Sequence, residues 1–182
     1  MSKTHETCAE KVGNAAFSRL YDLRAMLLPE RDMVALGDDG TMDTVLWIGD
    51  DIQYSLSDTS DYRDENGALD LDSLIDDEWG DITEYCYERF SEYGLSFDYV
   101  PGYTDFNPGE GYWRFQISCG GPSEEIRFFG ESDRFGKAEF WYLDWFDGAS
   151  TDVSDDAAAL AMWDTLSDCG SLDHAQQEAY SK

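Results

Sequence analysis

Negative charge is distributed unevenly along this sequence, and it limits both how the chain can fold and what it can bind. The formal charge is −28, from 40 acidic and 12 basic side chains. Residues 1–37 carry five of each and are neutral, whereas residues 38–92 carry eighteen acidic and two basic side chains, a net of −16. Residues 93–182 carry seventeen acidic and five basic side chains, a net of −12. Because like charges at this density oppose a compact fold, we expect the acidic surface to serve a function.

Aromatic residues allow so acidic a chain to fold. They make up 15% of the 182 residues and include six Trp, eleven Tyr and ten Phe. Low hydrophobicity with high charge is typical of disorder, but large buried rings offset the entropy lost on ordering. The length then predicts a single folded domain over residues 1–182.

The charge also indicates which partners to expect. It favours a basic nucleic-acid-binding protein and disfavours direct binding to nucleic acid or an anionic membrane, since both depend on Lys and Arg. No apolar run is long enough to span a membrane and no signal peptide is apparent. We therefore expect the protein to be located in the cytoplasm of a host cell. The four cysteines have neither zinc-site nor disulfide-framework spacing, and reduced thiols are expected.

Residues 1–93 are predicted to be mainly helical. Apolar residues recur every three or four positions between residues 7 and 28, Thr7 and Glu10 have capping-box spacing, and Pro29 ends the helix. This neutral helix could lie in the core or at a homodimer interface. A second amphipathic helix is predicted over residues 70–93. Between the two helices, residues 44–48 could be a short strand or the start of a helix, and residues 55–68 are predicted to be a loop.

After Gly94 the apolar pattern changes to the two-residue period of strands. Strands are predicted at 95–100, 112–119, 125–129 and 138–145, with short links that favour an antiparallel sheet over 94–150. Ser154 or Asp155 is expected to cap a C-terminal helix within 151–170, and the last dozen residues are expected to be frayed. The predicted fold class is α+β: an antiparallel β-meander of about four strands covered by two or three helices.

The candidate partner-binding site is an acidic surface on the second helix and the loop before it. Asp77, Asp81, Glu84 and Glu88 are three or four residues apart, which places four carboxylates along roughly 16 Å of one helix face. One DNA strand carries about one phosphate per 3.4 Å of axis, so the charge densities are comparable. The carboxylates expected to extend this row are Asp61, Asp64, Glu65, Asp70, Asp72 and Asp76.

Two alternatives explain the acidity without a partner. The first is an ordinary solvated helix face. The second is adaptation to high salt, which the presence of only four lysines fits. The neutral first 37 residues and the many rings argue against the second alternative, because salt adaptation should affect every exposed element.

The sequence predicts no catalytic, cofactor-binding or metal-binding residues, and therefore no enzyme. His5 and His174 lie near the ends, and no phosphate-binding glycine loop or nucleophile elbow is present. Residues 62–73 partly fit a calcium-binding EF-hand loop, but Tyr62 and Ser73 stand where the first and last carboxylates are needed. Asp144 and Asp147 could hold a metal, although solvated or capping roles are favoured.

Residues 118–132 (SCGGPSEEIRFFGES) and 138–150 (AEFWYLDWFDGAS) carry a resemblance to a known family. They resemble the C-terminal region of small acidic, largely uncharacterised proteins of plasmids, phages and integrated elements. In that region a GGP turn precedes a strand, a Gly-Glu turn and an aromatic strand ending in Asp-Trp. The matching positions are Gly120, Gly121, Pro122, Ile126, Arg127, Gly130, Glu131, Asp144 and Trp145. The resemblance implies a mobile-element origin and no catalytic residues.

Charge and resemblance together predict an acidic nucleic-acid mimic that occupies the basic DNA- or RNA-binding site of a host defence complex. In charge pattern the chain resembles anti-restriction and anti-CRISPR proteins that imitate DNA. The alternative is an immunity or partner protein for one basic protein, such as a nuclease toxin. The rings of Trp79, Trp113, Trp141 and Trp145 are expected mostly in the core, with one or two at an interface.

Overall fold

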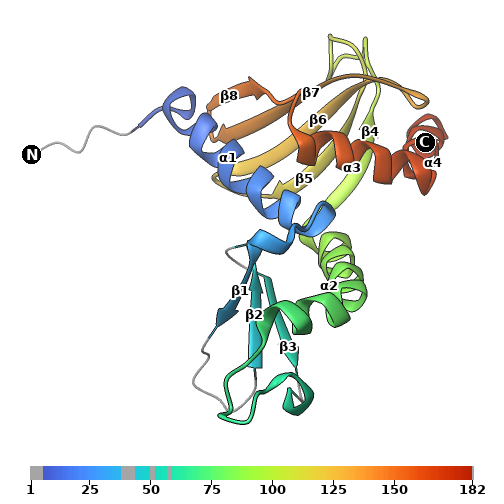
Figure 1. Cartoon of the computed structure of the whole chain (residues 1–182). Coiled ribbons are helices and arrows are strands. Elements are labelled where there is room, and N and C mark those ends of the chain that lie inside the picture. The colour runs from blue at the N-terminus through green and yellow to red at the C-terminus, as the bar shows by residue number, and fades with distance from the viewer. Residues whose placement is uncertain (1–5, 38–43, 50–51, 57–58, 182) are drawn as a thin grey trace, which may run out of the picture. The chain divides into compact units, whose positions relative to one another are not determined.

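The chain forms two compact units in the computed structural model, which describes residues 6–37, 44–49, 52–56 and 59–181 (Figure 1). The larger unit comprises Met1–Leu20 and Glu92–Lys182, and the smaller unit comprises Tyr21–Ser91. Two helices, α1 (Cys8–Leu27) and α2 (Leu71–Tyr93), each contribute residues to both units. The units are described separately below.

The smaller unit is built on a three-stranded antiparallel sheet in the order β1-β2-β3. These strands are β1 (Val34–Gly37), β2 (Thr44–Ile48) and β3 (Ile52–Leu56), and short 3-10 turns η1 (Arg31–Met33) and η2 (Ser60–Tyr62) flank them. Helix α2 packs against the sheet, and the Tyr85 hydroxyl donates a 2.9 Å hydrogen bond to the carbonyl of Gln53. The most buried side chains of this unit are Leu23, Val45, Leu46, Ile48, Leu74, Ile82 and Cys86.

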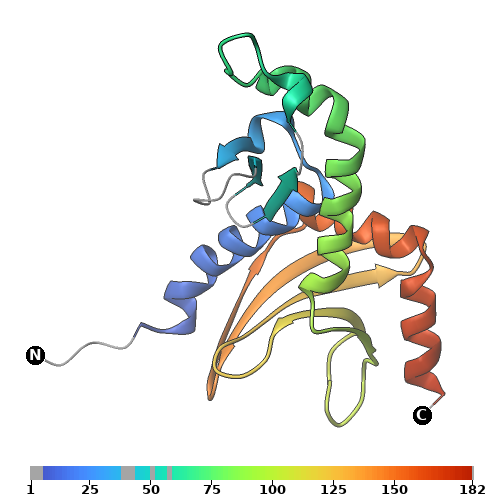
Figure 2. The same ribbon diagram turned by 90° about the horizontal axis from the view of Figure 1, so that it is seen from below.

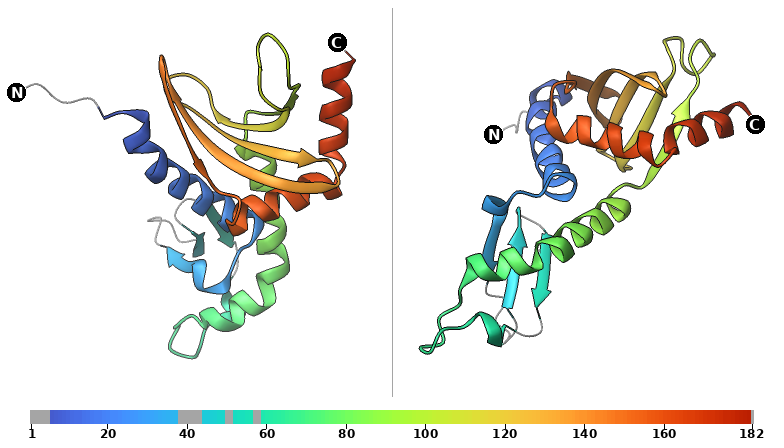
Figure 3. Two further views of the ribbon diagram at one scale, coloured as in Figure 1. Left: turned by 90° about the horizontal axis from the view of Figure 1, so that it is seen from above. Right: turned by 45° about the vertical axis from the view of Figure 1, so that its right-hand side comes forward.

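The larger unit is built on a five-stranded antiparallel sheet whose strands follow one another in chain order. They are β4 (Ser96–Val100), β5 (Tyr112–Ser118), β6 (Ser123–Glu131), β7 (Arg134–Asp144) and β8 (Asp147–Asp152). The first part of α1 and helix α3 (Ala157–Asp168) cover one face of this curved sheet, and α4 (Ser171–Tyr180) lies beside β4 (Figures 2 and 3). No described helix covers the opposite face, which we call the open face.

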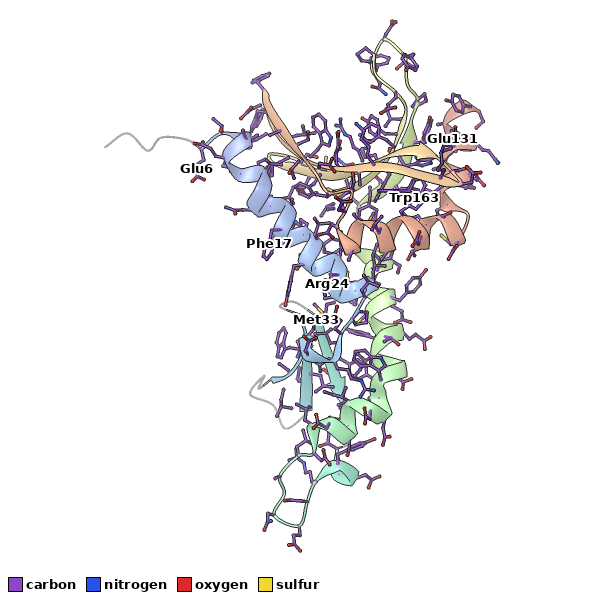
Figure 4. The ribbon with its side chains drawn as sticks, turned by 45° about the horizontal axis from the view of Figure 1, so that its top comes forward. Glu6, Phe17, Arg24, Met33, Glu131 and Trp163 are labelled. Atoms are coloured by element: carbon purple, nitrogen blue, oxygen red, sulfur yellow. The ribbon has the colours of Figure 1, made fainter. Side chains whose placement is uncertain are left out.

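Aromatic rings form the core between this sheet and α3. Alternate residues of β5 point toward the helices, so Trp113 is buried and its indole nitrogen donates a 2.9 Å hydrogen bond to the carbonyl of Leu172. Trp163 of α3 meets the rings of Trp113, Phe128 and Phe135 with centroid separations of 5.5, 5.9 and 5.5 Å (Figure 4). Such ring pairs add stabilisation beyond the area they bury.

The start of α1 is capped locally and is fixed to the sheet by one hydrogen bond from a backbone amide. Half of the predicted capping box is present: the Thr7 amide donates to the Glu10 carboxylate at 2.8 Å, whereas the Glu10 amide donates to the backbone carbonyl of Thr7 and not to its hydroxyl. The amide of Cys8 donates to Asp147 Oδ2 at 2.7 Å, which gives Asp147 a capping role. Further along, Arg19 pairs at 2.8 Å with Glu124, a carboxylate that is only 7% exposed.

The α+β class is confirmed, but the detailed arrangement differs from the prediction. Helices α1 and α2 make up most of the regular structure in residues 1–93, but β1, β2 and β3 add a second sheet that was not predicted. The meander has five strands rather than four, since β8 pairs along β7. Asp156, not Ser154 or Asp155, caps α3, and the residues expected to be frayed form α4. None of the helices in the described ranges is both long and apolar enough to cross a membrane.

All four cysteines are free thiols, and each unit buries one of them. Cys86 of α2 is fully buried, and this desolvation raises the pKa of its thiol to about 11. Cys8 is buried at the start of α1, whereas Cys119 and Cys169 are exposed. A buried thiol of high pKa is a poor nucleophile, and the two inner cysteines are packed in the interior.

Replacing Trp113 with Phe should destabilise the larger unit by about 1–3 kcal/mol, because the carbonyl of Leu172 loses its buried donor. Urea denaturation followed by circular dichroism measures this change. The matched control is Trp145→Phe, which makes the same substitution at a side chain that is 86% exposed and should leave the midpoint unchanged. Equal effects at both positions would show that the buried hydrogen bond contributes nothing.

Candidate acidic partner-binding surface

Helix α2 begins at a carboxylate that caps it. Asp70 accepts hydrogen bonds from the Ser73 amide at 3.2 Å and from the Ser73 hydroxyl at 2.9 Å. These two bonds, the amide bond first, lower the pKa of Asp70 below its ordinary value. Asp70 was predicted as a partner-binding residue; the structure shows a capping role for it, and partner binding stays a prediction.

The apolar face of α2 fixes the direction in which its carboxylates point. Leu74, Ile75, Ile82, Cys86 and Phe90 are buried within the unit. Asp77, Asp81, Glu84 and Glu88, which we call the acidic row, are all exposed on the solvent side of the helix. Because burial of the apolar face holds the helix in place, these four carboxylates have a fixed order and spacing.

The acidic row has no cationic partner in the part of the chain that the structure describes. None of the ion pairs among these residues includes any of its four carboxylates. One neutral contact is present, a hydrogen bond between Tyr62 and Asp77 that, after desolvation and the charge of Asp77, helps to raise the pKa of Tyr62. The row therefore keeps its negative charge available to a binding partner.

The other predicted site residues are also exposed, but some have structural roles. Asp61, Glu65 and Asp72 lie on the surface around the start of α2. Asp64 accepts 2.8 Å hydrogen bonds from the amides of Asn66 and Ala68, which holds a tight turn and lowers the pKa of its carboxyl.

Within the described parts of the chain, Asp76 is the one predicted site residue that forms an ion pair. It forms an exposed ion pair with Arg31, whose guanidinium also lies 5.5 Å from the ring of Trp79. The positive charge of Arg31 therefore compensates the negative charge of Asp76, whereas each carboxylate of the acidic row keeps its full charge.

Two residues beside the acidic row were not identified from the sequence. Glu78 accepts a 3.2 Å hydrogen bond from the Tyr54 hydroxyl, and burial followed by the nearby Glu78 raises the pKa of Tyr54 to about 12. Tyr87 lies one turn after Glu84 and is 50% exposed, so an aromatic ring is available next to the carboxylates. The Tyr54 contact joins residues 24 positions apart, which helix periodicity cannot predict.

On the larger unit, the open face of the sheet is close to neutral because its bases are paired. Arg114 makes a bidentate contact with Asp98, at 3.0 and 2.6 Å. Arg127 pairs with the buried Glu125 at 2.6 Å and lies 3.9 Å from the ring centroid of Trp141. Lys137 contacts Glu139 at 3.0 Å. This face therefore offers little free charge of either sign.

The net charge also differs between the two units. The smaller unit has 20 acidic and four basic residues, a net of −16 in 71 residues, and the larger has 20 and eight, a net of −12 in 111. The denser charge thus lies on the unit that carries the acidic row. Among the described residues, no three His, Cys, Asp or Glu side chains are grouped so that they could hold a metal ion.

Asp70→Ala should lower the melting temperature by a few degrees, because α2 loses its cap. The lowered pKa means that this stabilisation is complete at neutral pH and is lost as the pH falls through the folded-state value. The difference between variant and wild type should therefore shrink below about pH 4. Asp72→Ala, an exposed neighbour, is the control, and a gap that is constant with pH would contradict this role for Asp70.

No protein-family model matches the chain, and no curated protein or solved structure is significantly similar to it.

Proposed function

We propose that this protein is an acidic nucleic-acid mimic that occupies the basic DNA- or RNA-binding site of a host defence complex, of the restriction or CRISPR type. The observation that carries the proposal is the acidic row, four exposed carboxylates on one side of a helix whose opposite side is buried. A basic groove binds phosphates through Lys and Arg, and ordered carboxylates satisfy the same side chains.

The spacing of the row supports mimicry of a phosphate backbone. Steps of four, three and four residues give separations of about 4.5–6 Å along α2, and the full row spans roughly 16 Å. Successive phosphates on one DNA strand rise about 3.4 Å along the axis, so the two charge densities agree within a factor of about two. Asp61, Glu65 and Asp72 add exposed charge near the start of the helix.

The pairing of bases elsewhere in the chain also supports the proposal. Chain-wide adaptation to salt would leave every surface acidic, yet three bases of the larger unit, Arg114, Arg127 and Lys137, pair with carboxylates and leave its open face close to neutral. The smaller unit keeps a net of −16. Uncompensated charge is thus concentrated where a partner can approach it.

The mechanism we propose is competitive occupancy. Long-range attraction raises the association rate with a basic groove, and the exposed ring of Tyr87 provides apolar contact beside the acidic row. Binding driven in this way weakens as salt increases, because the Debye length falls to about 8 Å at physiological ionic strength. The protein itself needs no bound nucleic acid, metal or cofactor for this activity.

Reversing the row to D77K/D81K/E84K/E88K should abolish inhibition. The full chain is first used to capture partners from host lysate at low and high salt, and we expect a restriction or CRISPR subunit that is lost at high salt. DNA binding by the purified complex is then titrated with wild-type and reversed proteins, and the reversed protein should raise the inhibition constant by at least about 100-fold.

The matched control is D133K/D164K/D168K/D173K, which makes the same change in total charge at exposed carboxylates of the larger unit. This control should inhibit almost as well as the wild type. Full inhibition by the row variant would discard α2 as the binding surface, and capture of a single basic toxin would favour the immunity function instead.

A further inference from the structure

The turn between β7 and β8 presents two aromatic rings to solvent. Asp144 and Asp147 lie opposite each other as the last register partners of β7 and β8, so Trp145 and Phe146 alone form the tip of the hairpin. Trp145 is 86% exposed and Phe146 is fully exposed. Trp145 also has a φ of 53°, a conformation for which such turns usually use glycine. Residues in this strained conformation are found most often at functional sites.

A shallow hollow lies directly beside the tip. It is lined by Gly120, Gly121, Ser123, Leu143 and Trp145. A side chain at position 121 would meet the indole of Trp145, since a Cβ built there lies 2.9 Å from its nitrogen. The glycine therefore lets the indole lie close to the turn between β5 and β6, and it keeps the hollow open.

We propose that this aromatic tip is a self-association surface, in which Phe146 of each copy fills the hollow of a second copy. A twofold contact requires one patch that carries both the protruding group and the cavity that receives it. Here both features lie within one hairpin and the turn next to it, so a single patch meets this requirement. The inference uses the larger unit alone and is independent of the proposed function of the acidic row.

The buried area predicts a weak, reversible dimer. Two rings from each copy, at about 150–250 Å² each, bury roughly 800 Å² in total. Stable interfaces bury about 1,200–2,000 Å², so the tip alone falls below that range. A dissociation constant on the order of 10–100 µM is therefore expected.

Charge determines how this contact should respond to salt. Two copies repel each other through their net −28, and Asp144 and Asp147, which flank the tip, add to this repulsion. The Asp147 carboxylate accepts from the Cys8 amide at the start of α1, and the pKa of Asp147 is lowered mainly by that bond and slightly by Lys11. Added salt screens the repulsion and should strengthen the dimer, which is the reverse of its effect on binding to a basic groove.

Sedimentation equilibrium of the full chain tests the proposal, over about 10–500 µM protein and at about 50 and 500 mM NaCl. We expect a monomer–dimer equilibrium that shifts toward dimer at the higher salt. Phe146→Ser should weaken the dimer at least about tenfold. The matched control is Phe106→Ser, which removes another fully exposed ring from the loop between β4 and β5 and should change nothing.

A second variant separates association from folding. W145G/F146S places glycine at the position of positive φ, so its melting temperature should equal or exceed that of the wild type while the dimer is lost. A wild type that stays monomeric at both salt concentrations would overturn the proposal, as would equal effects of the Phe106 and Phe146 variants. The proposal would also be overturned if Phe146→Ser had the same sedimentation mass as the wild type but no longer bound a captured defence complex. The tip would then be a binding surface for that complex.

Discussion

Twelve basic side chains must coexist with forty carboxylates in this fold, and the positions of the bases decide where negative charge remains. In the larger unit several bases form ion pairs within the fold: Arg19 pairs with the buried Glu124. On the open face, Arg114 pairs with Asp98 on the neighbouring strand and Arg127 pairs with Glu125 on its own strand. Each pairing removes repulsion from a place where carboxylates would otherwise be buried or crowded. The charge left over lies on exposed helices and turns.

The amphipathic helix α2 converts that surplus into an ordered surface. Its buried side holds the helix against three short strands, and its capping aspartate sets where the helix starts. Carboxylates on the outer side then follow the helical repeat rather than moving independently. An ordered array of charge is the property that separates a mimic of a phosphate backbone from a merely solvated acidic segment, and it is the basis of the proposed function.

The elements that sequence analysis located well are those with a strong local signal. The predicted helix 70–93 differs from α2 by one residue at its start, because apolar side chains recur along its whole length and Asp70 is a good cap. The outward direction of the acidic row follows from the same periodicity. Strands β5 and β7 were located approximately because buried and more exposed residues alternate along most of their length.

The elements that were missed depend on contacts distant in sequence. Strand β8 (DGASTD) has no apolar alternation, and it becomes a strand only because β7 provides its hydrogen bonds. Helix α4 buries little beyond Leu172 and Ala175, too few to mark a helix in the sequence. The same limit applies to the site, because the pairing of Asp76 with Arg31 spans 45 residues.

The two buried cysteines have a practical consequence. Cys8 lies in the larger unit and Cys86 in the smaller one, and both are shielded from solvent while their unit is folded. Pulsed alkylation with peptide mapping would therefore time the opening of each unit separately, in the unmodified chain and with the exposed Cys119 and Cys169 as internal standards for full reactivity. The protein thus carries a built-in reporter for each of its halves, without any engineered label.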